Sequence, residues 1–157
     1  MIEIIIFKFI ISDIERICKR VSEIYTECII DEFIEWAKAD DEYLRNNKGF
    51  NDQTGNLRSS LGAGVYNDGQ MVFSTAFSKV LNGAKGSSMG KAFVESIAPS
   101  TSGKIVKIIV AAMPYAQSVE DIDSKDVLES RRIQNERVAR RILERAARKA
   151  QQQINRL

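Results

Sequence analysis

The sequence predicts a single α+β domain. Apolar residues recur at helical spacing near both ends of the chain, they alternate in the region between, and an Asn-Asp-Gly turn stands at 67–69. Helices at the ends and antiparallel strands in the middle are typical of the α+β class. With 157 residues the chain has the size of one domain and can bury a core of its own. We therefore expect residues 1–157 to form one domain.

The N-terminal part predicts a strand followed by a long helix. Residues 2–11 are dominated by isoleucine, a β-branched residue that favours extended structure. Ser12 and Glu15 then have the spacing of a capping box at a helix start. The helix is expected to end near residue 39. Its apolar stripe consists of Ile14, Ile17, Val21, Ile24, Cys28, Phe33 and Trp36.

The middle of the chain predicts a loop and a β-hairpin. Residues 40–54 are polar and lack an apolar period, so we interpret them as a loop. Residues 57–66 alternate between apolar and polar or small residues, which indicates a half-buried strand. The turn at 67–69 supplies the positive φ angles of a tight hairpin, and residues 71–77 form the return strand.

The remaining elements are a short helix, a third strand and a second long helix. We expect residues 82–88 to be a flexible connection and residues 90–98 to form a helix that stops at Pro99. Residues 104–113 are apolar on both faces, which predicts the central strand of the sheet. Residues 125–157 contain no glycine or proline and are rich in helix formers. This helix is expected to pack on the sheet at its start and to project, or meet another subunit, at its end.

The composition excludes much catalytic chemistry. The chain has no histidine, so a Ser-His or Cys-His nucleophile pair and a histidine-containing zinc site cannot form. The segment 86–92 resembles a phosphate loop only weakly, because Lys85 and Ala92 stand where a glycine and a hydroxyl residue are needed. The acidic residues at 120–126 lack the glycine and glutamate of an EF-hand. We therefore expect no catalytic, cofactor or metal site. We interpret 120–126 as an acidic approach to the last helix, that is, a segment before its N-terminus where negative charge interacts favourably with the helix dipole.

The cysteines and the apolar N-terminal run bear on the cell compartment. Cys18 and Cys28 are ten residues apart in a predicted helix, about 15 Å along its axis, so they are expected to be free thiols. Free thiols and the lack of a signal peptide favour synthesis in the cytoplasm. Residues 2–11 contain two charges and have about half the length of a membrane span, so no membrane association is expected.

The last helix carries a dense group of arginines, for which three roles stay open. They can form a solvated face, contact DNA phosphates, or pair with an acidic patch on another subunit. The DNA role would make the chain a small nucleic-acid-binding protein. The residues concerned are Arg131, Arg132, Arg137, Arg140, Arg141, Arg145 and Arg148.

Two phrases of the sequence resemble a known family. Thr54-Gly-Asn-Leu-Arg-Ser-Ser60 is similar to a signature of the head–tail joining proteins of tailed bacteriophages, also called neck or tail completion proteins. Met113-Pro-Tyr-Ala-Gln-Ser-Val-Glu120 resembles the second phrase of that family, and the two occur in the same order around a hairpin. By this resemblance we expect an assembly interface at the residues that carry it, which are Thr54, Gly55, Asn56, Leu57, Arg58, Pro114, Tyr115, Ala116, Val119 and Glu120.

The resemblance implies a structural role rather than an enzymatic one. Members of the family form a ring between the portal and the tail, with DNA passing through the middle. By this likeness the chain would be a homo-oligomeric ring subunit at the head–tail junction of the virion, in contact with portal, neck or tail proteins and with packaged DNA. If residues 57–66 are a strand, Arg58 points away from Leu57 and is free to engage a partner. The alternative is that the first phrase serves only folding, as a turn at the strand entry.

Overall fold

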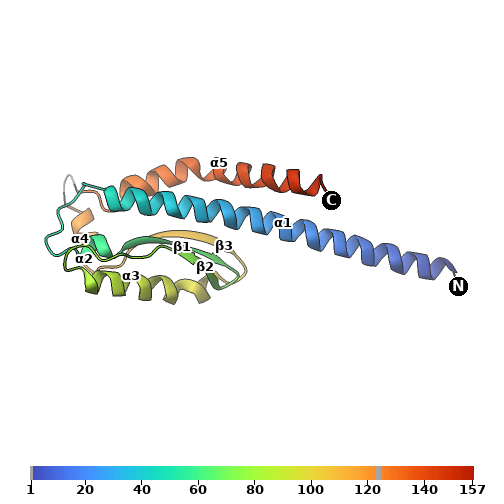
Figure 1. Cartoon of the computed structure of the whole chain (residues 1–157), viewed down its shortest axis with the longest axis horizontal. Coiled ribbons are helices and arrows are strands. Elements are labelled where there is room, and N and C mark those ends of the chain that lie inside the picture. The colour runs from blue at the N-terminus through green and yellow to red at the C-terminus, as the bar shows by residue number, and fades with distance from the viewer. Residues whose placement is uncertain (1, 123–124) are drawn as a thin grey trace.

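The computed structural model describes residues 2–122 and 125–157, with the side chains of residues 12–122 and 125–157. The chain is α+β, as predicted, with a long helix at each end and a sheet between them (Figure 1). The helices are α1 (Ile2–Asn46), α2 (Asn56–Ser59), α3 (Ala84–Ile97), the 3-10 turn η1 (Ala98–Thr101), α4 (Ala116–Glu120) and α5 (Glu129–Ile154). The strands are β1 (Leu61–Asn67), β2 (Gln70–Ser74) and β3 (Ile105–Ala111).

The elements form layers around the sheet. Helices α1 and α5 lie on one face and α3 lies on the other (Figure 1). Helix α5 returns alongside α1, and its first turns face β3 across a shallow pocket lined by Lys107, Ile109 and Asn135. The expectation that the C-terminal helix packs on the sheet at its start is thus confirmed. Its last part was expected to project, but it packs on Ile24 and Cys28 of α1 instead.

The sheet is antiparallel with strand order β2-β1-β3. Asp68 (φ 47°) and Gly69 (φ 78°) form the hairpin turn between β1 and β2, as predicted. The prediction of β3 as the central strand is wrong, because β1 lies between the other two strands. Strand β3 is apolar on both faces because helices cover both. Ile109 packs on the α1 side, and Val110 packs with Val94 of α3.

The predicted N-terminal strand is wrong, since residues 2–11 belong to α1. A lone strand at this end would need a neighbour to satisfy its backbone groups, whereas a helix bonds its own. The low helix propensity of isoleucine amounts to a few tenths of a kcal/mol per residue, roughly, and is outweighed by that requirement. The helix also runs to Asn46 instead of residue 39, so the predicted loop at 40–54 shrinks to residues 47–55.

Further boundaries also differ from the prediction. Residues 56–59 form the short helix α2, and β1 begins only at Leu61. Residues 84–88, predicted to be flexible, are the first turns of α3. Gly86 lets this helix approach α2 closely, because a Cβ there would lie 1.8 Å from the carbonyl oxygen of Asn56. The glycines in this segment therefore serve close packing.

Candidate functional site

The first phrase forms a turn that starts α2. Gly55 has a φ of 77°. The Asp52 carboxylate accepts hydrogen bonds from the backbone N–H of Gly55 (2.9 Å) and of Arg58 (2.7 Å). The Thr54 hydroxyl accepts one from the N–H of Asn56 (3.2 Å). Short polar side chains therefore hold the backbone in the one conformation that leads into α2.

The Arg58 side chain is engaged within the chain. Its guanidinium donates hydrogen bonds to the carbonyl oxygens of Arg45 (3.2 Å) and Asn47 (2.6 Å), and it lies 4.8 Å from the centre of the Phe50 ring. It thus satisfies carbonyl groups at the C-terminal end of α1, where a cation is also favoured by the helix dipole. The expectation that Arg58 is free to engage a partner is wrong. It assumed strand alternation, which does not apply to a helix.

The first phrase also locks α2 against α3. The side-chain oxygen of Asn56 accepts a hydrogen bond from the N–H of Gly86 (3.1 Å), and the Ser59 hydroxyl accepts one from the N–H of Val80 (2.8 Å). A Cβ at Gly55 would lie 1.9 Å from the carbonyl oxygen of Val80. The backbones are too close for any other residue at this position without a shift.

The second phrase meets the first in space. Met113 and Ala116 pack with Leu57 in one buried cluster, which partly buried Val119 also contacts. The N–H of Ala112 donates to the carbonyl oxygen of Ser60 (3.3 Å). Between Met113 and Ala116, Pro114 and Tyr115 are exposed. Two phrases that are far apart in the sequence thus form one continuous piece of structure.

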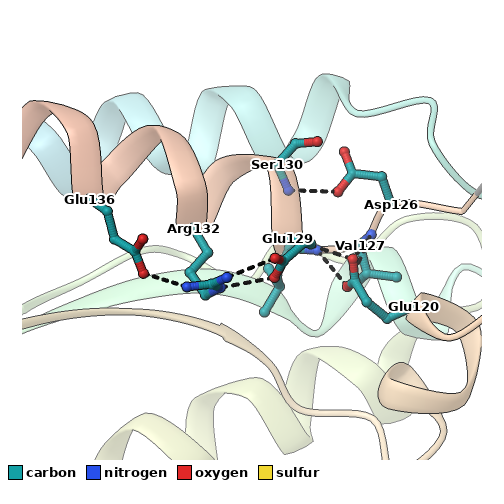
Figure 2. Close-up of polar contacts among 8 residues, drawn as sticks. Glu120, Asp126, Val127, Glu129, Ser130, Arg132 and Glu136 are labelled. Carbon is teal, nitrogen blue, oxygen red and sulfur yellow. Dashed lines mark hydrogen bonds and ion pairs between the residues drawn. The ribbon is translucent and has the colours of Figure 1, made fainter.

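Glu120, the last residue of the second phrase, caps α5. Its carboxylate accepts hydrogen bonds from the backbone N–H of Val127 (3.1 Å), Leu128 (2.8 Å) and Glu129 (3.1 Å), as Figure 2 shows in part. A negative charge on these unpaired N–H groups is favoured by hydrogen bonding and by the helix dipole. The acidic approach predicted for this helix is thus confirmed at Glu120.

The other acidic residues of this segment have separate partners. Asp126 accepts a hydrogen bond from the N–H of Ser130 (3.0 Å), next to the Glu120 cap (Figure 2). Asp121 accepts one from the Gln117 side chain (2.8 Å). Asp123 lies outside the described residues. Among the residues that the structure describes, no group of cysteine, aspartate and glutamate side chains is arranged to hold a metal ion.

Arg131 belongs to a buried charge cluster at Asp40. The Asp40 carboxylate, fully buried, pairs with Arg131 (2.5 Å) and with Lys107, and it accepts a hydrogen bond from Asn135 (3.1 Å). The Lys107 ammonium also lies 4.2 Å from the centre of the Trp36 ring. Burial and repulsion from Arg131 lower the pKa of Lys107 to about 7. When Lys107 is protonated, at pH values below about 7, one carboxylate here balances two cations, drawn from β3 and α5.

Sequence reasoning missed this cluster because it placed Asp40 in a loop. A signal was present, since Ala37, Asp40 and Leu44 have the three-and-four spacing of a buried helical stripe, and all three are fully buried. A charged residue on such a stripe is expected to have a buried partner of opposite charge.

The exposed arginines of α5 fall into two groups. Some have partners in the chain: Arg145 and Lys149 both pair with the buried carboxylate of Glu32 in α1. Arg132 pairs with Glu129 and Glu136, as in Figure 2, and Arg140 pairs with Glu144. The others make no ion pair within the described part of the chain and are exposed; they are Arg137, Arg141 and Arg148.

Arg131 and Arg145 fit none of the three open roles, because Arg131 pairs with buried Asp40 and Arg145 pairs with Glu32 of α1. The three roles stay open for the outward row Arg137, Arg141 and Arg148, which is exposed and has no ion pair within the described part of the chain. Both cysteines lie in α1 as free thiols, Cys18 exposed and Cys28 buried.

None of the helices in the described part of the chain is long and apolar enough to span a bilayer.

No family model matches the chain, and neither a curated protein nor a solved structure was found to be significantly similar to it.

Proposed function

We propose that the chain is a structural subunit of a phage head–tail connector or tail-completion ring, which joins the portal to the tail by protein–protein assembly and without catalysis. The observation that carries the proposal is the meeting of the two family-like phrases. Leu57 of the first and Met113 and Ala116 of the second pack in the same buried cluster. Residues that act together in a fold are expected to recur together in a family.

The two phrases also have matching structural tasks. Arg58 of the first satisfies carbonyls at the end of α1, and Glu120 of the second satisfies N–H groups at the start of α5. Both phrases therefore set the direction in which a long helix leaves the sheet. In a closed ring every subunit repeats the same rotation, so a small error in such a direction adds up around the circle. Rigid helix ends suit a ring subunit.

The experiment that tests the proposal is detection in assembled particles. Purified virions of the phage that encodes the chain should contain it in several copies, and antibody labelling should place it at the head–tail junction. Particles made without the chain should accumulate as separate heads and tails. Complete infectious particles that lack the chain would refute the proposal.

A second candidate is binding to nucleic acid, which the outward row of α5 favours. Arg137, Arg141 and Arg148 are spaced by four and seven residues, so they share one face of the helix. Such a row can neutralise backbone phosphates without reading sequence.

A salt titration separates this candidate from the first. If the row contacts three phosphates, replacing all three arginines by glutamine should lower the slope of log K against log salt by about 3. A control variant replaces Arg132 and Arg140, whose charges are already paired on the helix surface, and should change the slope less. Equal slopes for wild type and the triple variant would exclude the role in DNA binding.

A further inference from the structure

The apolar stripe of α1 is a helix-packing surface over part of its length. Ile24 and Cys28 are 1% and 3% exposed, and they pack against Ala146 and Ala150 of α5. The small alanines let the two helix backbones approach closely. Ile24 and Cys28 are separated by four residues, and the stripe continues towards the N-terminus through Val21, Ile17 and Ile14 at alternating spacings of three and four. This is the heptad spacing of helices that pack side by side.

Helix α5 covers only part of this apolar stripe of α1. Helix α5 ends at Ile154, and α1 extends well beyond that point (Figure 1). Residues 12–20 are all exposed, and Ile14 and Ile17 expose 54% and 56% of their surface. A largely apolar groove opens where α5 stops, and Arg16, Ile17, Arg20, Val21, Ile154 and Leu157 line it.

The sequence continues the pattern as far as Phe7, and Glu3 occupies the next position of the stripe. Phe7 and Ile10 keep the same spacing ahead of Ile14, and eight of the ten residues at 2–11 are apolar. A helix that is apolar on most of its circumference is stable in water only when neighbours cover it on more than one side. The segment therefore calls for several neighbouring helices.

We propose that residues 2–21 of α1 associate with the same segment of other copies in a parallel bundle of three or more helices. This inference rests on the proposed ring function and names the surface through which copies meet. Isoleucine occupies both the a-type and the d-type core positions of the heptad, at Ile10, Ile14 and Ile17. This favours a bundle of more than two helices. A parallel bundle places all the sheet domains at one end, around a common axis, which is compatible with a closed ring.

A second copy fits the stripe better than a lipid bilayer does. The apolar run at 2–11 rises about 15 Å as a helix, half of the roughly 30 Å hydrocarbon core. The charged residues Asp13, Glu15 and Arg16 follow it directly. The stripe also continues an interface that is already protein against protein, at Ile24 and Cys28.

The test replaces two exposed apolar residues of the stripe by charged ones and leaves the core of the domain unchanged. We expect wild-type protein to associate in light scattering after size-exclusion chromatography, and the double variant Ile14→Asp, Ile17→Asp to elute as a monomer. The thermal midpoint of the variant monomer should match that of diluted wild type, because both side chains are exposed in the single chain. The control Leu143→Asp makes the same change at a 46% exposed residue of α5 and should leave association intact.

The outcomes separate this inference from the proposed function. Wild type that stays monomeric over the whole concentration range, or a double variant that still associates, overturns the α1 bundle. So does monomeric wild type that binds vesicles of phosphatidylcholine and phosphatidylglycerol while the double variant does not, which would assign the stripe to a membrane. Association through α1 without any affinity for portal or tail proteins would sustain the bundle and refute the connector function. A double variant that enters virions normally would refute the bundle and leave the connector function standing.

Discussion

Residue 55 combines a backbone conformation and a close contact that only glycine meets. Its φ is +77°, and a Cβ would lie 1.9 Å from the Val80 carbonyl oxygen. Gly103 is a matched control, with a φ of +70° and nothing within 4 Å of the Cβ position. We expect Gly103→Ala to lower the free energy of unfolding by about 1–2 kcal/mol, and Gly55→Ala to lower it by about 2–5 kcal/mol, since steric overlap adds to the backbone cost. Urea denaturation measures both, and equal losses would contradict the close contact between Gly55 and the Val80 carbonyl.

Glu120 is expected to stabilise the start of α5. Replacing it by alanine leaves three backbone N–H groups without their acceptor and should lower the free energy of unfolding by about 1–2 kcal/mol. Glutamine retains one acceptor oxygen and should cost less. Asp121→Asn is the control, because the Asp121 carboxylate accepts its hydrogen bond from the exposed Gln117 side chain. Amide hydrogen exchange at residues 127–129 should rise in the alanine variant, and unchanged protection would refute the cap.

Glu32 makes the stability of the α1–α5 pair depend on pH. Burial by itself raises the pKa of Glu32, but hydrogen bonds from Lys149 and Arg145 outweigh burial and the pKa falls below its ordinary value of 4.5. The unfolded chain then takes up the proton at a higher pH than the folded one, so acid favours unfolding. We expect wild type to lose stability as the pH falls below about 4.5, and Glu32→Gln to be less stable at neutral pH with a shallower acid loss.

Glu144 provides the comparison for Glu32. It pairs with Arg140 of its own helix, α5, on the exposed surface. Glu144→Gln should change stability by less than about 0.5 kcal/mol and keep the wild-type acid profile. Thermal melts at several pH values between neutral and acid measure the stability of wild type, Glu32→Gln and Glu144→Gln. If Glu32→Gln keeps the full acid loss of wild type, the buried carboxylate is not its source.

At single residues the sequence indicates which positions matter better than what they do. The sequence indicates Glu120 as one of several acidic residues before a helix. It does not predict the hydrogen bonds of Glu120 to the N–H groups of residues 127–129, because no standard capping motif has this separation in sequence. Arg58 was assigned to an outward face because its segment alternates like a strand. Asp40 could not be paired with Lys107 from the sequence, because that contact depends on how α1 crosses the sheet.

At the scale of elements, the Asp40 cluster joins α1, β3 and α5. Asp40→Asn leaves Lys107 and Arg131 buried without a carboxylate, and we expect it to lower the free energy of unfolding by about 3–5 kcal/mol. Lys107→Met keeps the Asp40–Arg131 pair and lets an apolar chain pack on the Trp36 ring. It should therefore change stability by less than about 1.5 kcal/mol. Denaturant midpoints compare the two, and equal losses would mean that Asp40 does not balance both cations.

The elements that the sequence predicted well are those whose pattern is local. The 61–67 strand, its Asp68–Gly69 turn and the last helix follow from alternation, turn residues and helix formers. The errors concern choices that neighbours decide. Residues 2–11 have the composition of a strand but no strand beside them in the described structure. Strand β3 has the composition of a central strand because helices, not strands, cover it.

At the scale of the whole molecule, the arrangement is a small sheet domain from which a long helix extends. Helix α1 begins far from the sheet and reaches it only in its second half (Figure 1). The two phrases lie at the opposite end, where they terminate α1 and start α5. We infer a division of labour, in which the phrases fix the directions of the helices and the extended part of α1 meets other copies.

The proposed connector function is tested most directly by native mass spectrometry of the protein mixed with portal and tail proteins from the genome that encodes it. We predict a complex that contains several copies of the chain with the portal, in a fixed ratio. A chain that remains monomeric and unbound in the presence of both partners would contradict the account.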